Sequence, residues 1–141
     1  MNLRLVLLLF LAAVLPVTPL AQNHRVVRIS EKDGGNPGEV SVAINPKNPN
    51  NIIGVSFQYG RPGQVRVSNC RYVTNDGGKT WTTVSAANPR NLPQGDDSIT
   101  FNSEGSAYHA YMSFDGIRVK QPQRAFSGIW ISATKDGGQS W

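Results

Sequence analysis

The side chains that could do chemistry are four carboxylates, two arginines and a tyrosine near the ends of short β-rich runs: Glu39, Asp96, Asp97, Asp115, Arg61, Arg118 and Tyr59. Carboxylates accept hydrogen bonds from hydroxyl groups and can transfer protons. The planar guanidinium of arginine holds a carboxylate through two parallel hydrogen bonds, and a tyrosine offers a flat ring on which a sugar can stack. The sequence has no zinc-ligand spacing, phosphate-binding loop or catalytic triad, so we expect neither a metal nor a cofactor.

A second set of residues occurs twice with the same spacing. Residues 74–81 read TNDGGKTW and residues 134–141 read TKDGGQSW, which places Asp136 at 136 − 76 = 60 positions after Asp76. In such a turn an aspartate accepts hydrogen bonds from unpaired backbone N–H groups. The glycine adopts a conformation that side chains disfavour, and the tryptophan covers the turn. We therefore expect a structural role, rather than catalysis or calcium binding, for eight positions: Thr74, Asp76, Gly78, Trp81, Thr134, Asp136, Gly138 and Trp141.

The repeat extends upstream of the two turns. Residues 39–45 (EVSVAIN) match residues 96–102 (DDSITFN) at an offset of 96 − 39 = 57, and the same offset carries Ser56 and Phe57 onto Ser113 and Phe114. The chain therefore divides into units at 39–95 and 96–141. In the first unit, β-rich runs separated by turn residues predict strands near 40–44, 52–57, 67–73 and 80–84. In the second, strands are predicted near 98–101, 107–114 and 128–133, without the fourth.

A four-stranded antiparallel sheet that recurs at this period is the unit of a β-propeller. The prediction is an all-β chain with two propeller blades, the second incomplete, and a β-sandwich is the alternative fold. Because two blades cannot close a ring, we expect an amino-terminal fragment whose remaining blades come from sequence after Trp141. Alternating strand direction places the repeated turns at one end of the blades. We expect the candidate carboxylates, arginines and tyrosine to lie at the opposite end, which we call the upper rim: Glu39, Tyr59, Arg61, Asp96, Asp97, Asp115 and Arg118.

The pattern Ser/Thr-x-Asp-x-Gly-x-Thr/Ser-Trp resembles the Asp-box, or BNR repeat, of sialidases and related propellers, and both copies match every defined position. The resemblance covers residues 39–141. It implies a glycan as ligand and a site in which arginines hold the substrate carboxylate, an Asp is the acid/base and a Tyr is the nucleophile. Arg61 would correspond to the family's second arginine, and Asp115 would bind sugar hydroxyls.

The sequence departs from that family at two points. Residues 37–41 (PGEVS) lack the arginine of the family's Phe/Tyr-Arg-Ile-Pro motif, and residues 62–66 (PGQVR) contain no carboxylate. Two functions therefore stay open: a sialidase-like glycoside hydrolase, and a non-catalytic propeller that binds carbohydrate or protein. In the structural alternative Arg61 and Arg118 pair with neighbouring acids, while Glu39 and Asp96, at equivalent positions, hydrogen-bond from blade to blade.

Length and composition set the remaining limits. The chain has 141 residues, 39% of them apolar and 16% charged, with a net charge of +5. The apolar run 5–15 follows Arg4 and precedes a small residue at Ala21, which predicts a signal peptide at 1–21 and a lead-in segment at 22–38. That run is shorter than a membrane span, so we expect export without a span after cleavage. The basic residues are scattered, which argues against a nucleic-acid partner.

Overall fold

The computed structural model describes residues 26–30, 35–59, 67–88, 91–114 and 127–141. These residues form seven β-strands and no helix, so the described part of the chain holds no helix able to cross a membrane. The strands are β1 (Asn36–Ile44), β2 (Ile52–Tyr59), β3 (Ser68–Thr74), β4 (Thr82–Ser85), β5 (Gln94–Phe101), β6 (Ala107–Ser113) and β7 (Gly128–Thr134).

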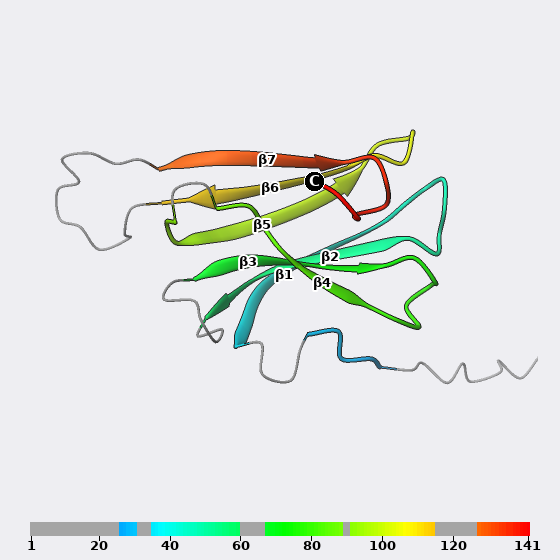
Figure 1. The fold of residues 1–141 in the computed structure, drawn as a ribbon, viewed down its shortest axis with the longest axis horizontal. Helices are drawn as coiled ribbons and strands as arrows, with labels where there is room; N and C mark the ends of the chain where they lie inside the picture. Colours follow the sequence, from blue (N-terminus) through cyan, green and yellow to red (C-terminus); the bar gives the residue numbers. More distant parts are fainter. Residues whose placement is uncertain (1–25, 31–34, 60–66, 89–90, 115–126) are drawn as a thin grey trace, which may run out of the picture.

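The strands form two antiparallel sheets with neighbours in chain order (Figure 1). One sheet has four strands in the order β1-β2-β3-β4, and the other has three in the order β5-β6-β7. This confirms the all-β prediction and the strand count of each unit. The two sheets do not close into a ring within the described residues.

Side-chain alternation explains which face of each sheet is buried. Successive strand residues point to opposite faces, so Ile53, Val55 and Val73 project from the first sheet to the same side. They meet Ile99 and Ala107 of the second sheet in the core, with Trp141 packed against its edge. The sheets therefore pack face to face, and the side chains between them supply the apolar area that stabilises the fold.

Hydrogen-bond registers locate the repeat more accurately than the sequence offset does. Ile44 pairs with Ile52, and Phe101 pairs with Ala107. Since Phe101 corresponds to Ile44 at the offset of 57, Ala107 corresponds to Ile52 at an offset of 107 − 52 = 55. The gapless match of Ser56 and Phe57 with Ser113 and Phe114 was therefore wrong, because the second hairpin turn is two residues shorter than the first.

Both sheets begin with the same irregularity in the edge strand. The register of β1 shifts between Gly38 and Ser41, and that of β5 shifts between Gly95 and Ser98. Glu39 and Asp96 occupy these bulges with φ values of 49° and 53°. Positive φ is uncommon for residues other than glycine, and bulges redirect side chains at sheet edges. The repeated bulge therefore sets where two of the candidate carboxylates point.

Candidate functional site

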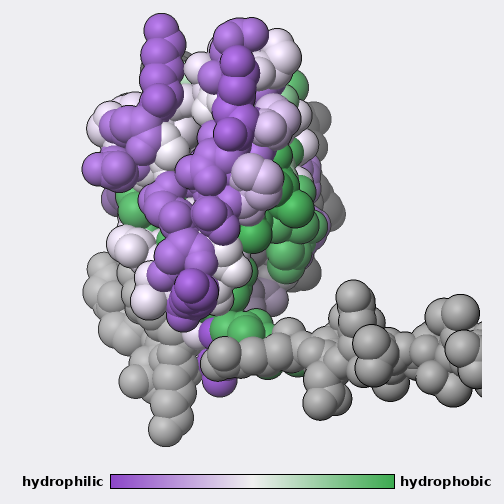
Figure 2. All heavy atoms as spheres, turned by 90° about the vertical axis from the view of Figure 1, so that its right-hand side faces the viewer, coloured by the Kyte–Doolittle hydropathy of each residue, from purple (hydrophilic) through white to green (hydrophobic). Residues whose placement is uncertain are grey.

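The two repeated turns, residues 74–81 and 134–141, lie at the opposite end of the sheets from the bulges. In Figure 1 they lie on the right with the β1–β2 and β5–β6 turns, and Figure 2 shows this end of the molecule with hydrophilic side chains over much of its described surface. Asp76 Oδ1 accepts hydrogen bonds from the amides of Lys79 (2.9 Å) and Thr80 (3.0 Å), while its Oδ2 accepts the Thr80 hydroxyl hydrogen at 2.6 Å. The Trp81 indole donates to the Gly78 carbonyl at 3.2 Å.

The second turn repeats these contacts. Asp136 Oδ1 accepts from the amides of Gln139 (2.9 Å) and Ser140 (3.0 Å), and the Ser140 hydroxyl donates to Oδ2. Hydrogen bonds from the side chains and amides of Thr80 and Ser140 hold the pKa of Asp76 and Asp136 well below its usual range. The carboxylates are thus occupied by their own turns. No group of acidic, His or Cys side chains able to hold a metal occurs among the described residues.

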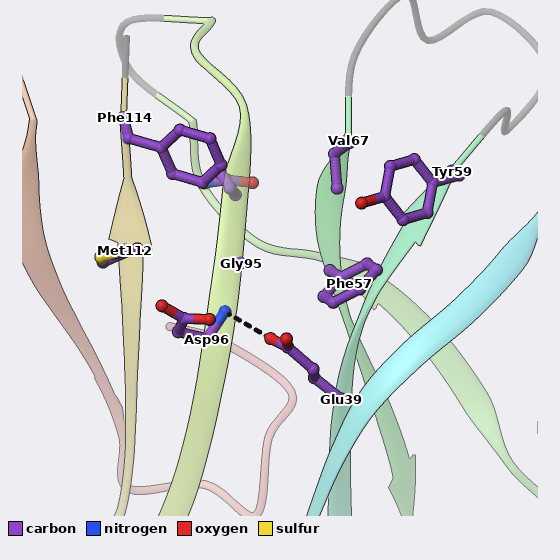
Figure 3. A pocket seen from close by; sticks show the side chains of 9 residues that line it. Glu39, Phe57, Tyr59, Val67, Gly95, Asp96, Met112 and Phe114 are labelled. Atoms are coloured by element: carbon purple, nitrogen blue, oxygen red, sulfur yellow. Dashed lines mark hydrogen bonds between the residues drawn. The ribbon is translucent and has the colours of Figure 1, made fainter. Parts of the chain in front are cut away.

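The candidate site is a pocket at the upper-rim end, in the space between the two sheets. Its volume is about 120 Å³, and its lining comprises Glu39, Phe57, Tyr59, Val67, Gln94, Gly95, Asp96, Met112 and Phe114. Figure 3 shows the rings of Phe114 and Tyr59 on opposite sides of the pocket, with the carboxylates of Asp96 and Glu39 below them. Three of the predicted upper-rim residues, Glu39, Asp96 and Tyr59, therefore come together here.

One carboxylate of the pocket is fixed by the neighbouring sheet. Glu39 Oε2 accepts a hydrogen bond from the backbone amide of Asp96 at 3.1 Å, which Figure 3 marks with a dashed line. Within the described part of the chain, the Asp96 carboxylate itself accepts no hydrogen bond. Among the described residues, no donor engages either carboxylate oxygen of Asp96 or the second carboxylate oxygen of Glu39.

The aromatic wall of the pocket is partly exposed. Tyr59 is 53% exposed and packs edge-on against Phe57, with ring centroids 5.1 Å apart and an interplanar angle of 90°. This contact holds the tyrosine ring while leaving part of it open to solvent. An apolar ring beside carboxylate acceptors is the combination used to bind a sugar, whose C–H faces stack and whose hydroxyls donate.

Asp97 does not line the pocket, contrary to its prediction as a rim ligand. The bulge turns it the other way, so that its side chain lies fully buried between the sheets and its Oδ1 is 2.6 Å from His109 Nε2. Arg61, Asp115 and Arg118 lie outside the described residues. The described pocket lining therefore contains carboxylates but no arginine.

His109 belongs to a buried polar triad that sequence reasoning missed. Arg71 Nε donates to His109 Nδ1 at 3.0 Å, so the imidazole proton lies on Nε2 and is donated to Asp97. The Arg71 guanidinium lies 4.0 Å from the centre of the Trp141 ring, and burial lowers the pKa of Arg71. The triad links β3, β6 and β5 across the core. His109 lies in a strand of alternating pattern, and its two partners lie on other strands, so no local sequence signal joins the three residues.

Two comparisons with known proteins gave no match: no family model matches the chain, and no curated protein does.

Proposed function

We propose that the chain is an exported protein of the sialidase-like Asp-box propeller group, and that the pocket formed by Glu39, Asp96 and Tyr59 binds carbohydrate. The two turns support the group, because in each the aspartate accepts backbone amide hydrogen bonds, as expected for the Asp-box pattern, and the tryptophan packs back on the turn by donating to a glycine carbonyl. The two sheets of matching strand order and matching bulges support propeller blades. Export rests on the predicted signal peptide at 1–21.

The observation that carries the binding proposal is the composition of the pocket. The Asp96 carboxylate, which no described residue engages, lines the same pocket as the partly exposed Tyr59 ring. Hydroxyl groups of a sugar would donate to Asp96 and to the remaining oxygen of Glu39, while its apolar face would stack on Tyr59. Since the described lining has no cation, these residues suit neutral sugar units. An acidic sugar would need positive charge from elsewhere on the rim.

The test is binding to a glycan panel by the exported chain and by two single variants. Tyr59→Ala removes the stacking ring, and Asp96→Asn removes the charge while keeping a residue that tolerates positive φ. Each should weaken binding about tenfold or more, as expected for the loss of one stacking or charged contact. Tyr108→Ala and Glu104→Gln are matched controls, because Tyr108 lies on the outer face of β6 and Glu104 in the β5–β6 turn at the other end. Equal binding by all five proteins would refute the proposal.

Glycoside hydrolysis is a second candidate function, favoured by the pair of carboxylates beside one pocket. Glycosidases use two carboxyl groups at the scissile bond, with sialidases substituting a Tyr nucleophile. Both Glu39 and Asp96 sit at strained backbone positions, a feature that clusters at functional sites. Release of the fluorophore from a panel of fluorogenic glycosides, including a sialoside, would support this function. Binding without turnover across the panel would leave carbohydrate recognition alone.

A further inference from the structure

Each sheet has one apolar face that nothing in the described structure covers completely. On β1, Val40, Val42 and Ile44 are 73%, 62% and 59% exposed, and on β7, Ile129 and Ile131 are 78% and 70% exposed. These residues lie on the faces that point away from the inter-sheet core. Branched aliphatic residues exposed in rows on two sheets are unusual for an isolated soluble domain, and such patches mark interaction surfaces.

The strand registers show that these two faces are the two halves of an interface already present inside the chain. At the core, the first sheet contributes Val55 and the second contributes Ile99 and Phe101. The counterpart of Val55 in the second sheet is Ala110 (110 − 55 = 55), on the outer face of β6. The counterparts of Ile99 and Phe101 in the first sheet are Val42 and Ile44 (99 − 42 = 57), on the outer face of β1. The free face of each sheet therefore corresponds to the buried face of the other.

The buried triad shows that the two free faces suit each other. The register counterpart of Arg71 is Ile131 (131 − 71 = 60). The counterparts of Asp97 and His109 are Val40 (97 − 40 = 57) and Gly54 (109 − 54 = 55). All three polar residues are thus absent from the free faces. If only one of the three triad residues had an apolar counterpart, docking of the two faces would bury a charge without its partners, which is strongly unfavourable. Because all three have non-polar counterparts, the two faces can pack without burying a charge of the triad.

The local shapes agree with this pairing. Ile131 replaces Arg71, and Gly54 leaves a hollow where His109 would stand. In the structure the hollow is occupied by Ile29 from the lead-in segment, whose Cδ1 is 3.5 Å from the place that a Cβ of residue 54 would take. The hollow therefore accepts an isoleucine side chain. Docking of Ile131 there would require the Ile29 side chain to move aside.

From these relationships we propose that copies of residues 1–141 associate head to tail, the outer face of β6 and β7 in one copy taking the place of a neighbouring blade on the outer face of β1 and β2 in the next. The new interface repeats the packing between the two sheets of one chain, so it is heterologous and its two sides differ. Continued addition gives a closed ring or an open filament. The inference rests on the strand registers and is independent of carbohydrate binding.

Sedimentation equilibrium of the chain purified after export tests the proposal. The average mass should rise above that of the monomer with increasing concentration. Ile131→Arg and Val42→Asp should each weaken association roughly thirtyfold or more, because each places an unpaired charge in the interface. Ser103→Arg and Ser103→Asp are charge-matched controls in an exposed turn and should associate like the unchanged chain. Near-ultraviolet circular dichroism verifies that each variant keeps its fold.

Mixing the two interface variants gives the decisive measurement. The Ile131→Arg chain keeps an intact β1–β2 face, and the Val42→Asp chain keeps an intact β6–β7 face. Each variant alone should be a monomer, and an equimolar mixture should reach the mass of a dimer and no higher. A monomeric unchanged chain, a single variant that associates normally, or a mixture that remains monomeric would overturn the proposal.

Discussion

The carboxylate of Glu39 accepts a hydrogen bond from the backbone amide of Asp96 at 3.1 Å, and these two residues occupy the same position in successive units. Each stands in a β-bulge with positive φ. The acid of one bulge thus satisfies an amide that the next bulge leaves without a strand partner. This agrees with the sheet-to-sheet hydrogen bonding expected for the pair, and it leaves the Asp96 side chain facing the pocket.

Removing this acceptor should destabilise the junction of the sheets. Glu39→Ala leaves the Asp96 amide to water or without a partner, and we expect the free energy of unfolding to fall by about 1 kcal/mol. Glu39→Gln keeps a side-chain carbonyl oxygen as acceptor and should lose less. Urea unfolding of the three proteins measures the difference. An alanine variant as stable as the unchanged chain would mean that the hydrogen bond contributes nothing net.

The Asp-box carboxylates should make stability depend on acid in a defined direction. The folded-state pKa of Asp76 and Asp136 lies below the unfolded value because the turn hydrogen bonds favour the ionised form. Their contribution is therefore complete above the unfolded pKa of about 3.9 and is lost as pH falls through the lower folded pKa. NMR titration of the side-chain carboxyl carbons should show both groups titrating below the unfolded-state value of about 3.9. Titration of either group at that ordinary value would contradict the assignment.

Replacing the carboxylate of Asp76 should remove its contribution to the acid dependence of stability. Asp76→Asn retains one carbonyl oxygen but loses the charge that strengthens the bonds from Lys79, Thr80 and Thr74. We expect a lower thermal midpoint at pH 7 and a smaller decrease on acidification. Glu104→Gln changes the same charge on an exposed turn and serves as the control. Equal midpoints for the two variants at pH 7 would show that the box carboxylate does not stabilise the turn.

Much of the fold could be predicted because the repeated turn, the β-rich runs and their spacing are local signals. The observed strands differ from the predicted ones mainly at their ends, as with β5, which begins at Gln94 rather than Ser98. The true alignment of β6 with β2, at an offset of 55 rather than 57, could not be predicted from the sequence. The turn at residues 102–106 is two residues shorter than the corresponding turn of the first sheet, and only the strand registers show this.

The candidate site was less predictable for a similar reason. Glu39, Asp96 and Tyr59 were placed by strand direction, which alternates regularly. Asp97 was misplaced because a bulge reverses which side of the strand a residue faces, and neither Asp96 nor Asp97 carries a sequence mark of that reversal. The triad escaped detection because Arg71, His109 and Asp97 are separated along the chain and meet only when the sheets pack.

The triad should behave as a unit in stability measurements. Arg71→Met removes the donor to His109 and leaves Asp97 as a buried charge, so we expect a loss of about 3–5 kcal/mol. The joint change to the register counterparts, Arg71→Ile, His109→Gly and Asp97→Val, removes every buried charge together. It should cost less than the sum of the three single changes. Additive losses in urea unfolding would show that the three side chains act independently.

Gly138 should tolerate no side chain, because the second Asp-box turn lies directly on the core. A Cβ at this position would lie 2.9 Å from Val73 Cγ2 and 3.4 Å from Ile53 Cδ1, and the φ of 95° is one that side chains disfavour. Gly138→Ala should therefore lower the free energy of unfolding by about 1–3 kcal/mol. Gly128→Ala is the control, because a Cβ at this position would lie at an ordinary contact distance of 3.6 Å from Trp130. Replacing a strand glycine by alanine also restricts the unfolded chain, so this variant should be as stable as the unchanged chain or more stable. Equal stability of the two variants would mean that the turn is not pressed against Val73.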